Sequence, residues 1–296
     1  MNHSPVTARS FIRKLLASVV SFARRRPPLL AELEAAVRNH EFIVHYQPII
    51  NLRLGRCLGA EALVRWRKSD GTMARPDSFL PLAQESGLIR PITDQIIERV
   101  MRDMGAMLAA DRSLHIAINL AASEVCSGRF LPGLQQHMKS FNVLPGQVWL
   151  ETTEGGYMHH QSAKLTLRKA RALGHIAAVE DFDIGSSSLQ SMGQLPLDAL
   201  KIDKAFVNGI GMDGSVESLV SDVIEMATTL KLFVVAEGVE TREQLDYLRA
   251  YNVHFAQGDL FAKALPIEAF EQYYRGETED CREARDVFGL FPSFGG

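Results

Sequence analysis

The chain has 296 residues, of which 46% are apolar and 23% are charged, and its formal net charge is −3. This composition is that of a folded globular protein with enough apolar residues for a large core, and the near-neutral charge argues against binding to a nucleic acid polymer. Cys57, Cys126 and Cys281 are too widely spaced for a CxxC zinc motif and too few for a disulfide framework, so we expect a reducing, cytoplasmic location.

Residues 1–28 differ from the rest because they contain six arginine or lysine residues and no aspartate or glutamate. The apolar run Leu15–Ala23 is too short to span a bilayer and lacks a signal-peptide cleavage site. We interpret residues 1–28 as a flexible leader or the remainder of a longer, membrane-anchored parent protein. A basic arm lying on an anionic membrane surface is the alternative.

Strand and helix patterns alternate from residue 29 onward. The predicted strands are Phe42–Ile50, Cys57–Trp66, Leu114–Leu120, Val148–Thr153, Ile176–Phe182, Ala199–Ile202, Phe233–Ala236 and His254–Ala256. The predicted helices are Leu30–Asn39, Asp77–Gln84, Ile92–Leu108, one from about Ser123, Ala163–Leu173, a short one near Ser187–Met192, Ser215–Leu230, Arg242–Ala250 and Ile267–Tyr274. We therefore expect one folded domain over residues 29–276 and a disordered tail over residues 277–296.

The number and order of these elements predict an α/β fold, a modified (β/α)₈ barrel. The link Asn51–Arg56 has the length of a hairpin, so the first two strands should be antiparallel. A doubly wound open sheet is the alternative. It is disfavoured because no glycine-rich phosphate loop follows an early strand.

An acidic pair follows the strand at Ile176. Glu180 and Asp181 stand where the apolar run Ile176–Val179 should end, within the stretch HIAAVEDFDIGSSS. Two adjacent carboxylates at the end of a buried strand are costly unless a cation meets them. Active sites of α/β barrels lie at this carboxyl end of the strands.

Other predicted strands also end in polar or charged residues. Together with the acidic pair, the set is Gln47, Glu61, Arg65, Asn119, Glu151, Glu154, Glu180, Asp181, Lys201, Glu237, Glu240 and Gln257. The carboxylates would converge in one cup and repel one another. Hard divalent cations such as Mg²⁺ or Mn²⁺ remove that repulsion because they prefer carboxylate and amide oxygen.

Two such cations would clamp an in-line displacement at phosphorus and activate a water molecule. Lys201 inside a barrel strand loses solvation, which acidic neighbours would offset. Arg65 offers a two-pronged donor for a substrate phosphate. As a set, these residues indicate hydrolysis of a phosphodiester.

The same residues belong to an ordered series of motifs between about Leu30 and Tyr274. The motifs are YQPII (Tyr46–Ile50), GAEALVRW around Glu61-Ala62-Leu63, FLPLAQESGLI (Phe79–Ile89), INLA (Ile118–Ala121), LETTE (Leu150–Glu154), LKIDKAFV (Leu200–Val207), VVAEGVET (Val234–Thr241) and QGDLFAKALP (Gln257–Pro266). In sequence and order they resemble the EAL-domain family, the cyclic di-GMP phosphodiesterases.

The resemblance implies a modified TIM barrel with an antiparallel strand near its start. It also implies hydrolysis of cyclic di-GMP to linear 5′-pGpG with Mg²⁺ or Mn²⁺, two ions per site, and inhibition by Ca²⁺. Members of this family commonly form homodimers through the surface next to the acidic-pair loop, which here would involve Ser186–Met192.

Residue roles follow from the motif positions. The implied metal ligands are Glu61, Asn119, Glu151, Glu180, Asp181 and Glu237. Lys201 is implied to orient the attacking water, and Glu237 is implied as a second-metal ligand or the general base. The implied loop supports are Glu154 and Glu240. The implied substrate-binding residues are Gln47, Leu63, Arg65 and Gln257.

The acidic-pair loop departs from the family pattern, because EDFDIGSSS stands where the family has DDFGTGYSS. Glu180 replaces an aspartate and Asp183 replaces a glycine. An active phosphodiesterase is the favoured hypothesis, since a pure binding module has no need of Lys201. The alternative is a degenerate EAL module that binds cyclic di-GMP or a protein partner without turnover. An unrelated metal-dependent barrel enzyme, such as an enolase-type lyase, does not account for the motif series.

Overall fold

A computed structural model describes residues 28–153, 160–180, 195–212 and 214–279, together with Cys281, Ala284 and Phe288. The strands in this part of the chain are β1 (Phe42–Asn51), β2 (Arg56–Arg67), β3 (Met73–Ala74), β4 (His115–Asn119), β5 (Val148–Thr153), β6 (Ile176–Glu180), β7 (Ala199–Ile202), β8 (Phe233–Ala236) and β9 (Phe255–Ala256). The eight predicted strands are all present. The short β3, which pairs with the end of β2, was not predicted from the sequence.

The strands described form one mixed sheet in the order β1-β9-β8-β7-β6-β5-β4-β2-β3, and β1 also pairs with β2, which closes a barrel. Strand β1 is antiparallel to both of its neighbours, whereas β2 and β4 to β9 are parallel neighbours. The predicted α/β barrel with one antiparallel strand near its start is thereby confirmed.

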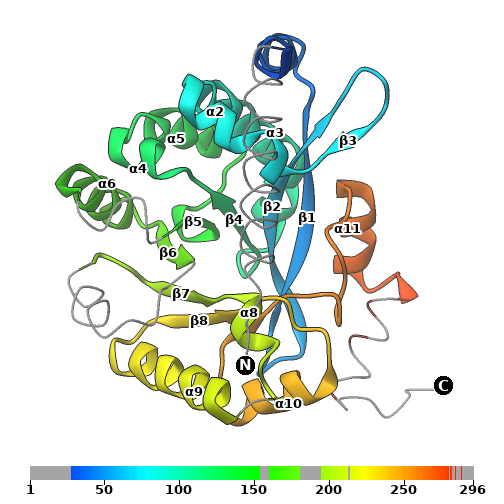
Figure 1. The fold of residues 1–296 in the computed structure, drawn as a ribbon, viewed down its shortest axis with the longest axis vertical. Coiled ribbons are helices and arrows are strands. Elements are labelled where there is room, and N and C mark those ends of the chain that lie inside the picture. Colours follow the sequence, from blue (N-terminus) through cyan, green and yellow to red (C-terminus); the bar gives the residue numbers. More distant parts are fainter. Residues whose placement is uncertain are drawn as a thin grey trace, which may run out of the picture.

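Helices surround the outside of the barrel (Figure 1). They are a helix over residues 28–38, η1 (Pro76–Ser78), α2 (Leu80–Ser86), α3 (Ile89–Ala110), α4 (Ala122–Ser127), α5 (Phe130–Ser140), η2 (Pro145–Gln147), α6 (Gln161–Ala172), α8 (Lys204–Val207), α9 (Gly214–Thr229), α10 (Arg242–Ala250) and α11 (Ile267–Arg275).

Two predicted helices are divided in the structure. The helix expected at Asp77–Gln84 is split into η1 and α2, with Pro81 in the first turn of α2, where its missing N–H costs nothing. The helix expected from about Ser123 is divided into α4 and α5 because Gly128, with a φ of 62°, ends α4. The short helix expected near Ser187–Met192 lies outside the described residues.

The side chains that point into the barrel near the amino ends of the parallel strands are apolar. Strand alternation directs every second side chain inward, and one buried cluster consists of Ile49, Ala117, Trp149, Ala178, Ala199, Val235 and Phe255. The ring of His115 stacks on Trp149 with centroids 4.3 Å apart. It fills the space left by Gly59, where a Cβ would come within 2.2 Å of the imidazole. We call Gly59, His115, Trp149 and Phe255 the barrel floor.

A second cluster lies at the opposite end, beside the start of β1. Its larger members are Leu33, Phe42, Trp66, Phe79 and Ile92, which we call the cup-side cluster. The rings of Trp66 and Phe79 meet edge to face at 5.8 Å. The helix over 28–38, both strands of the hairpin and the helices after β3 are thus held by one shared set of contacts.

Part of the predicted tail packs on the domain. Cys281, Ala284 and Phe288 are buried, and the ring of Phe288 stacks on Phe261 with centroids 6.1 Å apart. Most of residues 277–296, and all of residues 1–27, lie outside the described part of the chain. None of the described helices is both long enough and apolar enough to cross a membrane.

Candidate active site

The inward layer at the carboxyl ends of the strands is polar and charged. We call it the carboxylate cup, and its members are Gln47, Glu61, Asn119, Glu151, Glu180, Lys201, Glu237 and Gln257. Glu61 on β2, Glu151 on β5, Glu180 on β6 and Lys201 on β7 lie within the strands themselves. The structure therefore brings together most of the site residues that the sequence predicted.

Lys201 is the centre of the cup. Its Nζ lies 2.6 Å from Oε1 of Glu237, 2.8 Å from Oε2 of Glu151 and 3.2 Å from Oε2 of Glu61, and it also contacts Oε1 of Glu180. The side chain of Lys201 is only 1% exposed. One buried ammonium thus faces four carboxylates, and the cup keeps an excess of negative charge when all of them are ionised.

Burial and mutual charge set the protonation states. Burial lowers the pKa of Lys201, but the four carboxylates, Glu151 first, raise it well above its ordinary value. Burial raises the pKa of Glu151 well above its usual range, because Lys201 offsets only part of the desolvation. Burial likewise raises the pKa of Glu237 to about 7. Lys201 therefore stays cationic, and a further cation is needed to ionise both glutamates at neutral pH.

The pKa of Glu61 is shifted in the opposite direction, because two amides and Lys201 stabilise its ionised form. Burial raises its pKa, but Lys201, Gln257 and Asn119 together lower it below the usual value. The Nδ2 of Asn119 donates to Oε1 of Glu61 at 2.6 Å, and the Nε2 of Gln257 donates to Oε2. These hydrogen bonds fix the orientation of a carboxylate that is kept ionised.

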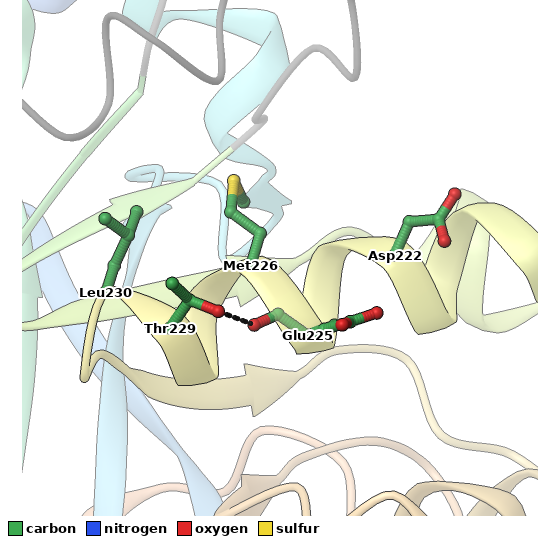
Figure 2. A pocket seen from close by; sticks show the side chains of 5 residues that line it. All are labelled: Asp222, Glu225, Met226, Thr229 and Leu230. Atoms are coloured by element: carbon green, nitrogen blue, oxygen red, sulfur yellow. Dashed lines mark hydrogen bonds between the residues drawn. The ribbon is translucent and has the colours of Figure 1, made fainter.

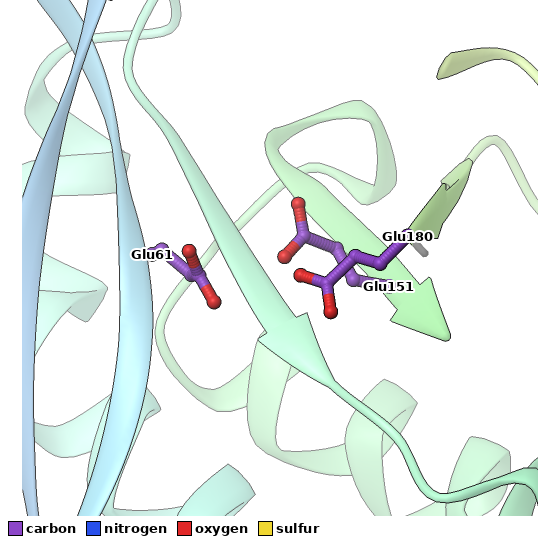
Figure 3. A group of neighbouring side chains, drawn as sticks. All are labelled: Glu61, Glu151 and Glu180. Carbon is purple, nitrogen blue, oxygen red and sulfur yellow. The ribbon is translucent and has the colours of Figure 1, made fainter. Parts of the chain in front are cut away.

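A divalent cation fits the donor set. Glu61, Glu151 and Glu180 each present a carboxylate oxygen within 4.8 Å of the others, and Figure 3 shows them directed toward one another from β2, β5 and β6. Oε1 of Glu151 and Oε1 of Gln257 are buried and have no hydrogen-bond partner in the described part of the chain. Buried oxygens without a donor are the ligands that Mg²⁺ and Mn²⁺ take.

The predicted substrate-binding residues divide into two groups. Gln47 and Leu63 line the cavity of the cup, and the Nε2 of Gln47 donates to the carbonyl of Ala262 at 3.3 Å. Arg65 is on the same side of β2 as Glu61 and Leu63, one step further out, but it does not line this cavity. It is half-buried, its Nη1 donates to the carbonyl of Val64 at 2.8 Å, and Arg75 and Asp77 are charged neighbours.

Three further predicted site residues are not among the members of the carboxylate cup. Glu240 lies outside the cup and forms an exposed ion pair with Lys204. Glu154 and Asp181 lie outside the described residues, as does the loop that follows Glu180. Their predicted roles stay predictions.

Sequence reasoning missed the second half of the cavity. The cavity has a volume of about 640 Å³ and extends from the cup along the side of η1, α2 and α3. The residues of that extension include Val64, Pro76, Asp77, Leu80, Gln84, Ile89, Thr93 and Ile96, and we call it the apolar arm. No strand end marks these residues. Val64 belongs to the motif GAEALVRW, and the only signal for the others was their position in and beside the motif FLPLAQESGLI.

A separate depression of about 340 Å³ lies on α9 and is lined by Asp222, Glu225, Met226, Thr229 and Leu230 (Figure 2). Four of the five come from α9, and Leu230 directly follows its last residue. The hydroxyl of Thr229 donates to the carbonyl of Glu225 at 3.0 Å. No residue of the cup contributes to its lining. It lacks the convergent polar groups from several elements that mark a small-molecule site.

The fold and the cup define the class of protein, a modified TIM barrel with a carboxylate-rich cation site at the carboxyl ends of its strands. The sequence model of the EAL domain matches residues 30–264, and the chain belongs to this family. The family predicted from the motifs is therefore confirmed.

Curated relatives and solved structures agree with membership of the EAL family. The chain is 40% identical over 263 residues to "Probable cyclic di-GMP phosphodiesterase PdeB" of Escherichia coli (strain K12), covering 89% of this chain and 49% of that protein. It is 34% identical to "Cyclic di-GMP phosphodiesterase NbdA" of Pseudomonas aeruginosa, covering 93% of this chain and 35% of that protein. The chain thus spans half or less of these relatives' length. The solved structure "PaMucR Phosphodiesterase, c-di-GMP complex" superposes with a TM-score of 0.76 at 31% identity, covering 82% of this chain and 99% of that one.

Proposed function

We propose that this domain hydrolyses cyclic di-GMP to linear 5′-pGpG with Mg²⁺ or Mn²⁺ as cofactor. The observation that carries the proposal is the position of Lys201. Its buried ammonium contacts four carboxylates at the ends of separate strands, beside one cavity. Membership of the EAL family and relatives named as cyclic di-GMP phosphodiesterases support the choice of substrate.

Glu61, Glu151 and Glu180 would hold the cation, and Asn119, Asp181 and Glu237 are the further ligands that the motifs imply. Divalent ions at such a site neutralise charge at phosphorus and activate water for attack. When its carboxylates are ionised, the cup keeps more negative charge than Lys201 balances, and a divalent cation would balance the rest. The ions and the scissile phosphate would therefore bind together in the carboxylate cup.

The residues of the chain itself have separable roles in the hydrolysis. Hydrolysis forms one bond between phosphorus and the water oxygen and breaks one P–O3′ bond. Glu237 lies in the cup with Oε1 2.6 Å from Nζ of Lys201, and as an ionised carboxylate it is suited to accept the proton of the water. Lys201 cannot act as a base because its pKa is raised well above the ordinary value, so it acts as a fixed cationic donor that orients the water and the carboxylates. The departing O3′ takes a proton from solvent.

The direct test is incubation of the purified protein with cyclic di-GMP, with chromatographic detection of pGpG. We expect turnover with Mg²⁺ or Mn²⁺, none in EDTA, and no restoration by Ca²⁺. Glu61→Gln should abolish turnover with an unchanged circular dichroism spectrum, because it removes one ligand charge. Glu225→Gln on α9 is the matched control and should be fully active. Tight binding of cyclic di-GMP without any pGpG would instead support the degenerate binding module.

We also propose that the domain forms a homodimer and works in the cytoplasm. The dimer rests on the family resemblance, since the segment at residues 186–192 that would be close to the interface lies outside the described part of the chain. Light scattering with and without cyclic di-GMP and metal tests it. A strict monomer under all of these conditions would contradict the dimer and leave the proposed reaction unaffected.

A further inference from the structure

Exposed apolar side chains are found at the end of the barrel opposite the carboxylate cup. The segments that lead into the parallel strands lie at this end, and the hairpin between β1 and β2 lies there too, because β1 is antiparallel to its neighbours. These segments carry large apolar side chains that are each 40–48% exposed, namely Leu54, Leu144, Leu173, Phe233 and Tyr251. The chemistry of the cup does not account for them, because the cup lies at the other ends of the same strands.

Exposed cations accompany these apolar side chains along the chain. They lie in the same segments or in the last turn of the helix before them, and they are Arg53, Lys139, Lys169 and Lys231. None of the four makes an ion pair or a side-chain hydrogen bond within the described part of the chain. Their charges are therefore available to a ligand outside the molecule.

The acidic side chains of these segments, Asp111 and Asp198, are already bound within the fold. Asp198 accepts hydrogen bonds from Nε and Nη2 of Arg171 and from the backbone N–H of Ala177. Asp111 accepts a hydrogen bond from the hydroxyl of Tyr274. This end of the barrel is therefore cationic, although the chain has a net charge of −3. We call the exposed residues at this end the floor-side face: Arg53, Leu54, Lys139, Leu144, Lys169, Leu173, Lys231, Phe233 and Tyr251.

An anionic lipid surface matches both properties of this face. Its negative potential attracts lysine and arginine, and its interfacial zone accepts apolar side chains from separate loops at once. A nucleic acid would match the cations but leave the apolar side chains without a partner. We propose that the floor-side face docks on an anionic bilayer, with Leu144 and Leu173 in the interfacial zone and Lys139, Lys169 and Lys231 at the level of the lipid phosphates. The carboxylate cup of the docked domain then faces away from the bilayer, open to solution.

The first test is cosedimentation of the purified protein with vesicles of phosphatidylcholine alone or of phosphatidylcholine mixed with phosphatidylglycerol. We expect binding only to the vesicles that contain the anionic lipid, and loss of binding at high salt, because ions screen the attraction. Each cation near an anionic surface contributes about fivefold in affinity. The combined variant Lys139→Gln, Lys169→Gln and Lys231→Gln should therefore bind about 100-fold more weakly.

The matched control is the combined variant Arg38→Gln, Arg102→Gln and Arg129→Gln. These arginines are also exposed but lie outside the floor-side face, and Arg38 and Arg129 are near the cup end, beside the starts of β1 and α5. The control removes the same total charge, so its affinity for the anionic vesicles should change by less than about threefold. Circular dichroism checks that both variants are folded.

The second test separates insertion from charge attraction. Leu173→Trp should give tryptophan fluorescence that shifts to the blue on anionic vesicles and is quenched by brominated lipid, because the indole enters the interfacial zone. Leu165→Trp is the matched control. Leu165 is 56% exposed on α6, which ends just before Leu173, but it lies about two helical turns nearer the cup, so its fluorescence should not respond.

Three results would overturn the inference. The first is an unsubstituted protein that binds no anionic vesicle even at low salt, including one retained by an acidic protein instead. The second is a lysine variant that binds as well as the arginine control. The third is an equal fluorescence response at positions 165 and 173. Each of these results would leave the proposed hydrolysis standing, because turnover of cyclic di-GMP is measured in solution without vesicles.

Discussion

The barrel floor and the carboxylate cup are made by the same strands and yet have opposite chemistry. On β5, Trp149 belongs to the floor and Glu151 to the cup, and both are buried, with 5% and 0% of their surface exposed. On β7, Ala199 belongs to the same apolar cluster as Trp149, and Lys201 belongs to the cup. A step of two residues along a strand moves the inward side chain from one layer to the next.

The two layers also make opposite contributions to stability. The floor buries aromatic surface in stacked and edge-to-face contacts, which favours folding. The cup takes charges out of water and leaves buried oxygens without partners, which opposes folding until a cation arrives. Stability and chemistry are therefore separated by layer within one barrel, and each layer can be altered without the other.

The largest effect is expected for Lys201→Met, which removes the ammonium shared by four carboxylates. We expect hydrolysis to fall by about 100- to 1,000-fold, the range for loss of one preorganised electrostatic donor. The metal-free protein should lose about 3–5 kcal/mol of unfolding free energy, because a broken buried ion cluster leaves uncompensated charge. Mn²⁺ should restore part of that loss in a thermal denaturation assay.

Lys204→Met is the matched control for that prediction, because Lys204 forms an exposed ion pair with Glu240 near the same end of the barrel. It should cost less than about 1 kcal/mol. A Lys201→Met protein that hydrolyses cyclic di-GMP at the parent's rate would remove Lys201 from the mechanism.

The next largest effect is expected in the floor. Trp149→Ala should cost about 3–5 kcal/mol in urea unfolding, because it deletes a buried indole and leaves a cavity. Mn²⁺ affinity and KM should stay within about twofold, since no cup residue is changed. If metal affinity fell while stability stayed the same, the two layers would not be separable.

The floor also predicts a pH dependence of stability. Burial lowers the pKa of His115 to about 4, whereas a histidine in the unfolded chain titrates near 6.5. Between these values the unfolded chain binds a proton that the folded chain does not. The unfolding free energy should therefore fall by about 2–3 kcal/mol as the pH drops from about 6.5 to 4, and then level off.

His115→Phe isolates this contribution because it keeps the ring stacked on Trp149 and removes the titration. The measurement is the difference between parent and variant in urea unfolding at each pH, so other groups that titrate in this window cancel. Parallel pH profiles of the two proteins would contradict the assignment to His115.

The smallest effect is expected for Glu180→Asp, which shortens one cup ligand without changing its charge. A glutamate reaches about 1 Å further than the aspartate of the family pattern, and ligand geometry matters most in the transition state. We expect turnover in Mg²⁺ to rise about threefold, or the Mg²⁺ requirement to fall, with affinity for cyclic di-GMP in Ca²⁺ unchanged. A slower variant would show that the cup is adapted to glutamate.

The strands and the cup could be predicted from the sequence because both depend on local patterns. Val148–Thr153 was predicted to the residue as β5, since a buried parallel strand is a short apolar run with polar residues at its end. Glu61, Glu151 and Lys201 could then be placed together without coordinates, because the carboxyl ends of neighbouring parallel strands meet at one face of a barrel.

The apolar arm could not be predicted in the same way. Whether Asp77 and Gln84 face the cavity depends on how η1 and α2 pack against β2, which is a tertiary property. Glu240 illustrates the same limit. It follows Glu237 in one motif but pairs with Lys204 outside the cup, because the backbone turns at Gly238, where φ is 63°.

The antiparallel direction of β1 has a mechanical consequence. Because Phe42 at its start pairs with Trp66 at the end of β2, the chain enters the barrel on the side of the cup. The helix over 28–38 packs there in the same cluster as Val64 and Ile89, and these two residues also form the wall of the apolar arm. The helix over 28–38 and the wall of the apolar arm therefore share the packing of Val64 and Ile89, so a displacement of this helix would reach the cavity directly. In an all-parallel barrel the first strand would begin at the opposite end, away from the cup.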